Sequence, residues 1–276
     1  MKLIRDHVRE TFRKYTDAYD SSDPKINLKI IHTYHVAEDA DEIARSLDLS
    51  DSDTDLAWLL GMLHDLGRFE QIRRYGTFND AKSMSHAHLS CEVLFPDFYN
   101  VDQKFFDEMP NGRFGQIRDF IEEGTEEDYD LIRTAIWNHS EYGIPDDLDE
   151  RHTMFSNIIR DADKVDIFRV NVEESIEDIY NVSENQLKDA CVSDQAVDAI
   201  RKHICVERRA DYKPTSVDHV ISHSCLAFEL VYPMSREITK RQGYLQKLVS
   251  FQSNNQKTQS AMELLKKELY NVFEKN

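Results

Sequence analysis

Apolar residues recur every three or four positions along most of this chain. In the segment 26–47 they alternate with acidic residues, a pattern typical of a helix with one buried and one solvated face. Over residues 56–63 the apolar run is nearly continuous, as in a buried helix. Asp51 or Ser52 is suited to be the N-cap of this second helix, and Gly67 is suited to be its C-cap. The pattern therefore predicts a long amphipathic helix followed by a buried one.

Similar patterns predict more helices downstream. These helices cover residues 87–95, 115–123, 130–139 and 154–170. The polar stretch 69–86 predicts a loop with a short helix at its start. Beyond about residue 171 the pattern indicates ordinary packing helices, with candidate linkers at Ser183–Asp194 and Ser253–Gln259.

The composition favours the same fold class. Eight Gly and six Pro in 276 residues are few, which favours long helices over an all-β or low-complexity chain. A hydrophobic content of 40% is enough to bury a substantial core. We predict an all-α protein, with a helical bundle over residues 1–170. A helical C-terminal extension over residues 171–276 is expected to pack on the same domain.

Charge and cysteine usage narrow the expected partners. The chain has 34 Lys and Arg against 52 Asp and Glu, and this net charge of −18 repels duplex nucleic acid and anionic membranes. No run of about 18 apolar residues occurs, and the N-terminal segment has no apolar core. The four cysteines form no C-x-x-C pair, as expected of reduced thiols. We expect a cytoplasmic protein that binds neither duplex nucleic acid nor membranes.

Histidine and aspartate residues interrupt the apolar pattern in five places. They lie in the segments HTYHVA, MLHDLG, SHAHLSCEVL, WNHSEYGIP and RDADKVD. Burying such groups unpaired costs about 1–3 kcal/mol each, so they need partners. Neutral imidazole and carboxylate are ligands of first-row divalent metals, and a shared metal compensates this cost. The residue types therefore indicate a metal site, provided that the five segments converge in the fold.

The order of these segments resembles the HD superfamily of metal-dependent phosphohydrolases, whose signature is H...HD...D on a helical bundle. The resemblance covers residues 26–170. The first His of the signature corresponds to His32 in HTYHVA, the HD pair to His64 and Asp65 in LLGMLHDLGRF, and the last Asp to Asp163 in RDADKVD. His35 stands where relatives often carry Arg. The resemblance implies that the four signature residues hold a divalent metal ion.

Two further histidines resemble the subset of this superfamily that binds two metals. His86 in HAHLSCEVL and His139 in NHSEYGIP match ligands of a second metal, which would share Asp65 as a bridge. The likeness to the HD-GYP branch is partial, because Ser140 replaces its second His, no complete GYP follows, and Arg68 replaces a Lys. The resemblance leaves open whether one or two ions bind, and whether they are Mn, Fe, Ni, Co, Zn or Mg.

The activity implied by the resemblance is hydrolysis of a phosphoester by a metal-bound water or hydroxide. The substrate would be a small phosphorylated metabolite or nucleotide. Candidate catalytic residues are Asp65, Arg68 and Lys164, and candidate substrate contacts are Arg68, Arg73, Arg74 and His35. Cations near the ligands suit the negative charge on phosphoryl oxygens. Arg73 and Arg74 fit a solvated turn equally well.

Two other functions stay open. A cyclic nucleotide or dinucleotide phosphodiesterase is favoured if two metals bind, and a non-catalytic sensor of metal or nucleotide is the alternative from another class. The motifs G-x-x-x-x-G-K-[ST] and G-x-G-x-x-G are absent, so ATP-driven and nicotinamide chemistry have no sequence support. The sequence leaves open whether the chain forms a homodimer and what the C-terminal extension does.

Overall fold

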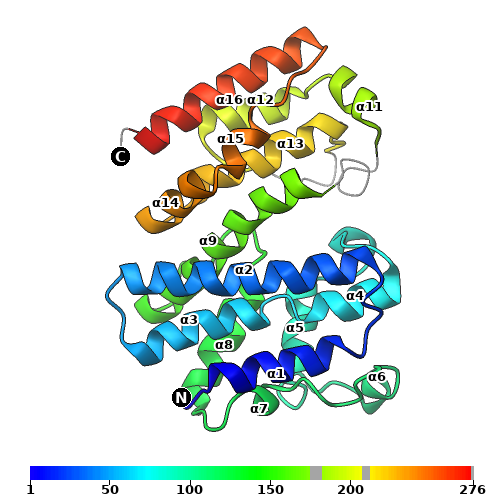
Figure 1. Cartoon of the computed structure of the whole chain (residues 1–276), viewed down its shortest axis with the longest axis vertical. Coiled ribbons are helices and arrows are strands. Elements are labelled where there is room, and N and C mark those ends of the chain that lie inside the picture. Colours follow the sequence, from blue (N-terminus) through cyan, green and yellow to red (C-terminus); the bar gives the residue numbers. More distant parts are fainter. Residues whose placement is uncertain (175–181, 207–211, 275–276) are drawn as a thin grey trace. The chain divides into compact units, whose positions relative to one another are not determined.

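The computed structural model describes residues 1–174, 182–206 and 212–274. In these ranges the elements are helices. In addition, Lys2 and Glu123 form an isolated antiparallel β-bridge. The chain divides into two compact units, Met1–Ala162 and Asp163–Asn276, whose helices are labelled in Figure 1. The prediction of an all-α fold is confirmed.

The first unit packs its helices around one apolar core. Its elements are α1 (Arg5–Thr16), α2 (Pro24–Ser46), α3 (Asp51–Leu63), α4 (Gly67–Tyr75), η1 (Asp80–Lys82), α5 (His86–Leu94), α6 (Gln103–Asp107), α7 (Ile117–Phe120), α8 (Glu126–Asn138) and the first part of α9 (Glu150–Glu173). Helix α2 lies along α3, α4 contacts α5, and α5 contacts α8 (Figure 1). Fully buried apolar side chains from these helices include Val36, Ile43, Leu59, Leu63, Leu89 and Ile132.

The buried helix α3 differs at both ends from the sequence prediction. Its N-cap is Ser50, whose side chain accepts from the Asp53 amide at 3.1 Å, so the predicted caps Asp51 and Ser52 lie inside the helix. The helix ends at Leu63, and the predicted C-cap Gly67 instead begins α4. A glycine is required at position 67 for another reason, because the backbone of α5 lies too close to leave room for a side chain.

Two glycines let neighbouring helices approach closely. A Cβ atom on Gly61 would lie 2.4 Å from Ala37 Cα, and a Cβ atom on Gly67 would lie 2.5 Å from the Ser90 amide nitrogen. Such distances are far shorter than van der Waals contact, so any larger residue would push the helices apart. Gly61 therefore sets the spacing of α3 and α2, and Gly67 sets the spacing of α4 and α5.

Local backbone conformation and capping explain other differences between the predicted and the observed helix boundaries. The helix predicted over 115–123 is reduced to α7, since Gly115 has a positive φ of 111° that a helix does not contain. Helix α8 begins at Glu126, four residues earlier than predicted, because Thr125 and Asp128 form a capping box. The short helix predicted at the start of the stretch 69–86 is part of α4, whereas helix α1 was not predicted.

The second unit is also helical. After the end of α9 it contains α11 (Glu184–Asp189), α12 (Asp194–Lys202), α13 (Ser216–Cys225), η2 (Leu226–Glu229), α14 (Pro233–Gln242), α15 (Tyr244–Leu248) and α16 (Gln256–Glu274). Helix α13 contacts α11, α12, α15 and α16. The segment Ser183–Asp194, predicted as a linker, instead holds α11, which begins with a capping box between Ser183 and Gln186. The other predicted linker, Ser253–Gln259, runs into the first turn of α16.

Within the described ranges, every helix is too short or too polar for a bilayer crossing.

Candidate metal centre

His64 and Asp65 follow directly after the last residue of α3. His64 is the C-cap of this helix, and its Nδ1 lies 2.8 Å from the carbonyl oxygen of Gly61. A carbonyl oxygen can only accept a hydrogen bond, so Nδ1 is the protonated nitrogen and the lone pair of the neutral ring lies on Nε2. Both side chains are buried, with 0% exposure for His64 and 2% for Asp65.

His139 is held in the same way at the end of α8. It is the C-cap of that helix, and its Nδ1 donates to the carbonyl oxygen of Ile136 at 2.6 Å. Carbonyl groups at and after the last residue of the helix are held by Arg160, whose guanidinium donates to the carbonyl oxygens of Asn138 at 2.8 Å and Glu141 at 2.5 Å. A capped helix end with a buried arginine therefore orients this imidazole.

The Asp65 carboxylate lies between two pairs of histidines. Its Oδ2 is 3.5 Å from His32 Nε2 and 3.6 Å from His64 Nε2. Its Oδ1 is 3.5 Å from His86 Nε2 and 3.8 Å from His139 Nε2. These distances are too long for hydrogen bonds. The four imidazoles and one carboxylate come from α2, the end of α3, the start of α5 and the end of α8.

This donor set fits divalent metal ions. Asp65 Oδ1 is buried and has no hydrogen-bond partner among the described residues. Ligand atoms that bind one tetrahedral ion at about 2.1 Å lie roughly 3.4 Å apart, close to the distances around the carboxylate. Ligand atoms of His64, Asp65 and His139 also lie within 4.8 Å of one another.

The contact between His86 and His139 adds an independent argument. Their Nε2 atoms are 3.1 Å apart. Since each ring uses its Nδ1 proton to donate, His139 to Ile136 and His86 to Asp80, both Nε2 atoms carry lone pairs when the rings are neutral. Two lone pairs facing each other are stabilised by a positive group nearby, such as a metal ion or the Arg68 guanidinium, whose Nη2 lies 3.2 Å from His86 Nε2.

The charge states at neutral pH suit metal binding. Burial opposes ionisation of Asp65, but the positive charge of Lys29, followed by His64, holds its pKa well below the usual value. Burial and the charge of Arg68 lower the pKa of His86 to about 4, so this ring is neutral at pH 7. Neutral imidazole and ionised carboxylate are the ligand forms.

Arg68 lies beside this cluster, and its predicted roles in catalysis and substrate binding stay predictions. Its Nη2 donates to His86 Nε2 at 3.2 Å, and its Nη1 donates to Gln71 Oε1 at 2.7 Å and to the Phe78 carbonyl oxygen at 2.8 Å. Its Nε is 3.5 Å from Asp65 Oδ1. The guanidinium therefore places positive charge at the edge of the donor set.

Arg73 and Arg74, the other predicted substrate contacts, are paired with Glu70. Arg73 Nη2 and Arg74 Nε each lie 2.8 Å from Glu70 Oε2, and the Tyr19 hydroxyl donates to Oε1 at 2.8 Å. Glu70 is completely buried, so both arginines neutralise a charge within the protein. A role for them in substrate binding stays a prediction.

Three further predicted residues lie in α2 and α9. His35 lies in α2, three positions after His32. Asp163 and Lys164 lie in α9 and belong to the second unit, where Lys164 Nζ is 3.3 Å from Glu229 Oε2. Their predicted roles, as substrate contact, metal ligand and catalytic cation respectively, stay predictions.

Two residues of the site were not predicted from the sequence. Lys29 Nζ lies 2.6 Å from Asp65 Oδ2, and Asp80 Oδ2 accepts from His86 Nδ1 at 2.6 Å. Lys29 stands three positions before His32, a spacing that puts both on one side of a helix and could have indicated it. Asp80 lies in a 3-10 turn after α4, where no periodic signal marks a polar residue.

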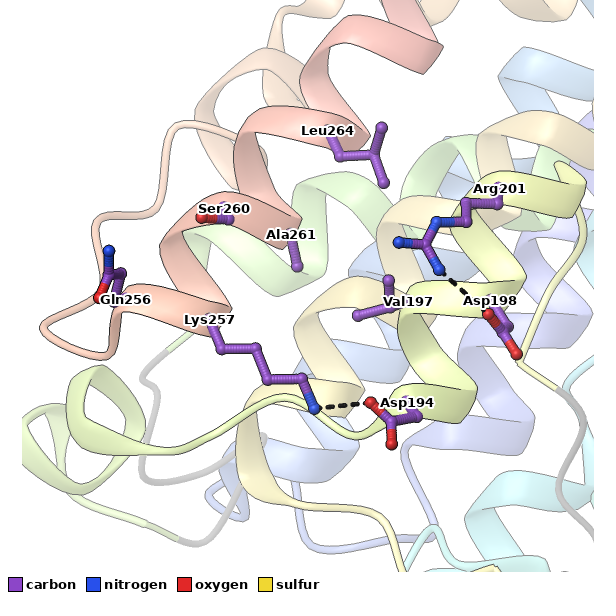
Figure 2. Close-up of a pocket in the computed structure, with 9 residues that line it drawn as sticks. All are labelled: Asp194, Val197, Asp198, Arg201, Gln256, Lys257, Ser260, Ala261 and Leu264. Atoms are coloured by element: carbon purple, nitrogen blue, oxygen red, sulfur yellow. Dashed lines mark hydrogen bonds and ion pairs between the residues drawn. The ribbon is translucent and has the colours of Figure 1, made fainter.

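A hollow in the second unit is lined by different groups from those of the metal cluster. It lies between α12 and α16, where Lys257 pairs with Asp194 at 2.8 Å and Arg201 with Asp198 at 3.4 Å (Figure 2). Its two cations and two carboxylates neutralise each other. The arrangement therefore offers no net charge to an anionic substrate.

A family model described as HD domain matches residues 30–167, half of the chain. No curated protein and no solved structure gives a match. The matched span contains His32, the His64–Asp65 pair and Asp163 in the order of the signature. The predicted resemblance is confirmed for the superfamily, whereas the likeness to the HD-GYP branch stays a prediction. HD domains are generally metal-dependent phosphohydrolases, and this chain belongs to the HD domain family.

Proposed function

We propose that this protein is a metal-dependent phosphohydrolase that acts on a phosphoester of a small metabolite or nucleotide. The observation that carries the proposal is the Asp65 carboxylate, which presents one oxygen to His32 and His64 and the other to His86 and His139. A carboxylate surrounded in this way can serve two ions at once.

The proposed ligands divide into two sets. His32, His64 and Asp65 Oδ2 would hold one ion, with Asp163 as a further ligand carried over from the family signature. His86, His139 and Asp65 Oδ1 would hold the second. A bound divalent ion would lower the pKa of its water ligand to about 7 and would neutralise phosphoryl oxygens.

The chain itself supplies the groups that recognise the phosphate. Lys29 and Arg68 place two positive charges within 3.5 Å of the Asp65 carboxylate, on a protein whose net charge is −18. Such local charge attracts an anionic ester that the remaining surface repels. Arg68 presents a planar guanidinium, which suits the paired oxygens of a phosphate.

The experiment that tests this function compares wild type with Asp65→Asn. Metal content is measured by elemental analysis after loading with Mn, and hydrolysis is measured with p-nitrophenyl phosphate and bis-p-nitrophenyl phosphate. We expect wild type to retain metal and cleave the monoester, and Asp65→Asn to lose both properties. Asp53→Asn is the matched control, because Asp53 lies in the first turn of the helix that precedes Asp65 and pairs with Arg151 at 2.6 Å instead.

Each other outcome has a defined meaning. Cleavage of the diester but not the monoester would replace the monoesterase with a phosphodiesterase for cyclic nucleotides or dinucleotides. Retained metal without cleavage of either ester would favour the sensor. Absence of bound metal in wild type, also after addition of Mg, would overturn the metal-dependent function.

A further inference from the structure

Asp80 connects the loop after α4 to the first residue of α5. We infer that Asp80 is a positioning residue, which holds the His86 imidazole so that its Nε2 faces Asp65 Oδ1 and His139. The inference rests on the proposed function, because it concerns the ion that His86 would bind. It adds a residue outside the family signature to the machinery of the site.

The hydrogen bond between the two side chains sets the orientation of the ring. His86 Nδ1 lies 2.6 Å from Asp80 Oδ2. A carboxylate only accepts, so this contact keeps the proton on Nδ1 and the lone pair on Nε2. That Nε2 lies 3.1 Å from His139 Nε2 and 3.5 Å from Asp65 Oδ1. Without Asp80 the ring could rotate or carry its proton on the nitrogen needed for the metal.

The Asp80 carboxylate is itself held from the opposite side. Its Oδ1 accepts from Gln71 Nε2 at 2.7 Å and from Arg68 Nη1 at 3.1 Å. Gln71 is fully buried and also donates to Ser83 Oγ and to the Met84 carbonyl oxygen, both at 2.9 Å. The loop is therefore tied to α4 by a side chain that cannot move freely, and this makes Asp80 a rigid acceptor for His86.

A second Asp–His pair in the same unit provides a matched control. Asp149 Oδ2 lies 2.8 Å from His152 Nδ1, which is the same type of hydrogen bond. His152 Nε2, however, is 3.5 Å from Asp130 Oδ2 and contacts no other imidazole among the described ring contacts. Asp149→Ala therefore removes an equivalent bond outside the metal cluster.

The test measures metal affinity and the protonated nitrogen of His86. Metal affinity is obtained by competition with a coloured chelator, for Mn and Zn, in wild type, Asp80→Ala, Asp80→Asn and Asp149→Ala. Groups that orient a ligand typically contribute 10–100-fold to metal affinity. We expect Asp80→Ala to weaken the second equivalent of metal by that factor, and Asp149→Ala to leave metal affinity unchanged. Asp80→Asn keeps an acceptor oxygen and should lose less.

Nitrogen NMR of protein labelled at histidine gives a readout that needs neither activity nor metal. In wild type, the His86 signal, assigned by its loss in His86→Gln, should show a proton on Nδ1. In Asp80→Ala this signal should move toward the average of the two tautomers. The His139 signal should keep its Nδ1 proton, because Ile136 holds that ring independently.

A control for the loop separates positioning from general folding. Ser83→Ala removes one anchor of the loop but leaves the Asp80–His86 bond in place. Equal loss of metal affinity in Ser83→Ala and Asp80→Ala would overturn the inference, since loop order would then carry the effect. Unchanged metal affinity together with an unchanged His86 signal in Asp80→Ala would also overturn the inference. If wild type binds metal in the same experiment, the proposed function still stands. Wild type that binds no metal would instead overturn the proposed function itself.

Discussion

Lys29 Nζ lies 2.6 Å from Asp65 Oδ2, on the side of the carboxylate that faces His32 and His64. The ammonium therefore neutralises the Asp65 carboxylate. A divalent ion at the same oxygen would be repelled by this charge. Lys29 thus keeps the buried Asp65 paired before the metal arrives, and its charge is then available to an anionic substrate.

Replacing Lys29 by Met should tighten metal binding and weaken phosphate binding. A unit charge at 4 Å contributes about 1 kcal/mol in water and about 4 kcal/mol near a protein surface, so we expect metal affinity to rise about tenfold. The KM for a phosphoester should rise by a similar factor. Competition titration and steady-state kinetics measure the two effects. Lys25→Met is the control, because Lys25 donates to the Gly76 carbonyl oxygen at 2.9 Å. Weaker metal binding in Lys29→Met would contradict this role.

The number of bound ions should separate the two sides of Asp65. We expect about two ions per chain in wild type, and about one in His86→Ala or His139→Ala, because these rings approach only Oδ1. His32→Ala should lose the other ion. Elemental analysis and circular dichroism of the same samples measure metal and folding together. One ion in wild type that His86→Ala leaves in place would exclude the second metal.

Glu70 should contribute to stability rather than to metal binding. Its buried carboxylate is balanced by Arg73 and Arg74, so Glu70→Gln leaves two cations without their partner. Loss of one partner from a buried pair costs about 3–5 kcal/mol, and partial exposure of the arginines reduces this to about 2–3 kcal/mol of unfolding free energy. Urea unfolding measures the change. Glu10→Gln, in an exposed pair with Lys14, is the control and should leave stability nearly unchanged.

The same residue predicts a pH dependence. Burial opposes ionisation of Glu70, but hydrogen bonds from Arg73, Arg74 and Tyr19 lower its pKa below the ordinary 4.5. A carboxylate with a lowered pKa in the folded state stabilises fully above its unfolded pKa and loses this effect as the pH falls through the folded value. The difference in melting temperature between wild type and Glu70→Gln should therefore be constant at pH 6–7 and shrink below about pH 4.5. A difference that grows on acidification would contradict this sign.

The two interhelical glycines should not tolerate a methyl group. Gly61→Ala and Gly67→Ala force a Cβ against backbone atoms of α2 and α5, so each should destabilise the protein by about 1–3 kcal/mol and weaken metal binding. Gly143→Ala is the matched control, because its Cβ would meet no atom within 4 Å. Thermal unfolding and metal titration of the three variants test this. Wild-type affinity in Gly61→Ala would show that the α2–α3 spacing does not position the ligands.

The sequence indicated the candidate ligands better than their surroundings. His64 and Asp65 stood out because polar groups inside an apolar helix need partners, and this cost can be read from a single segment. Helix ends were predicted less well, since Ser50 and Thr125 compete with neighbouring caps of similar propensity. Gly67 is a residue type that often ends a helix, but its role depends on the backbone of the separate helix α5, which begins at His86.

The sequence by itself determined the all-α class, the HD signature and the set of buried histidines, because periodicity and the cost of burial act within one helix. Only the tertiary structure decided that each oxygen of Asp65 faces a different histidine pair. It also decided that Arg73 and Arg74 balance Glu70, and that Asp80 holds His86. These relationships depend on distances between segments remote in sequence, and helix packing sets those distances.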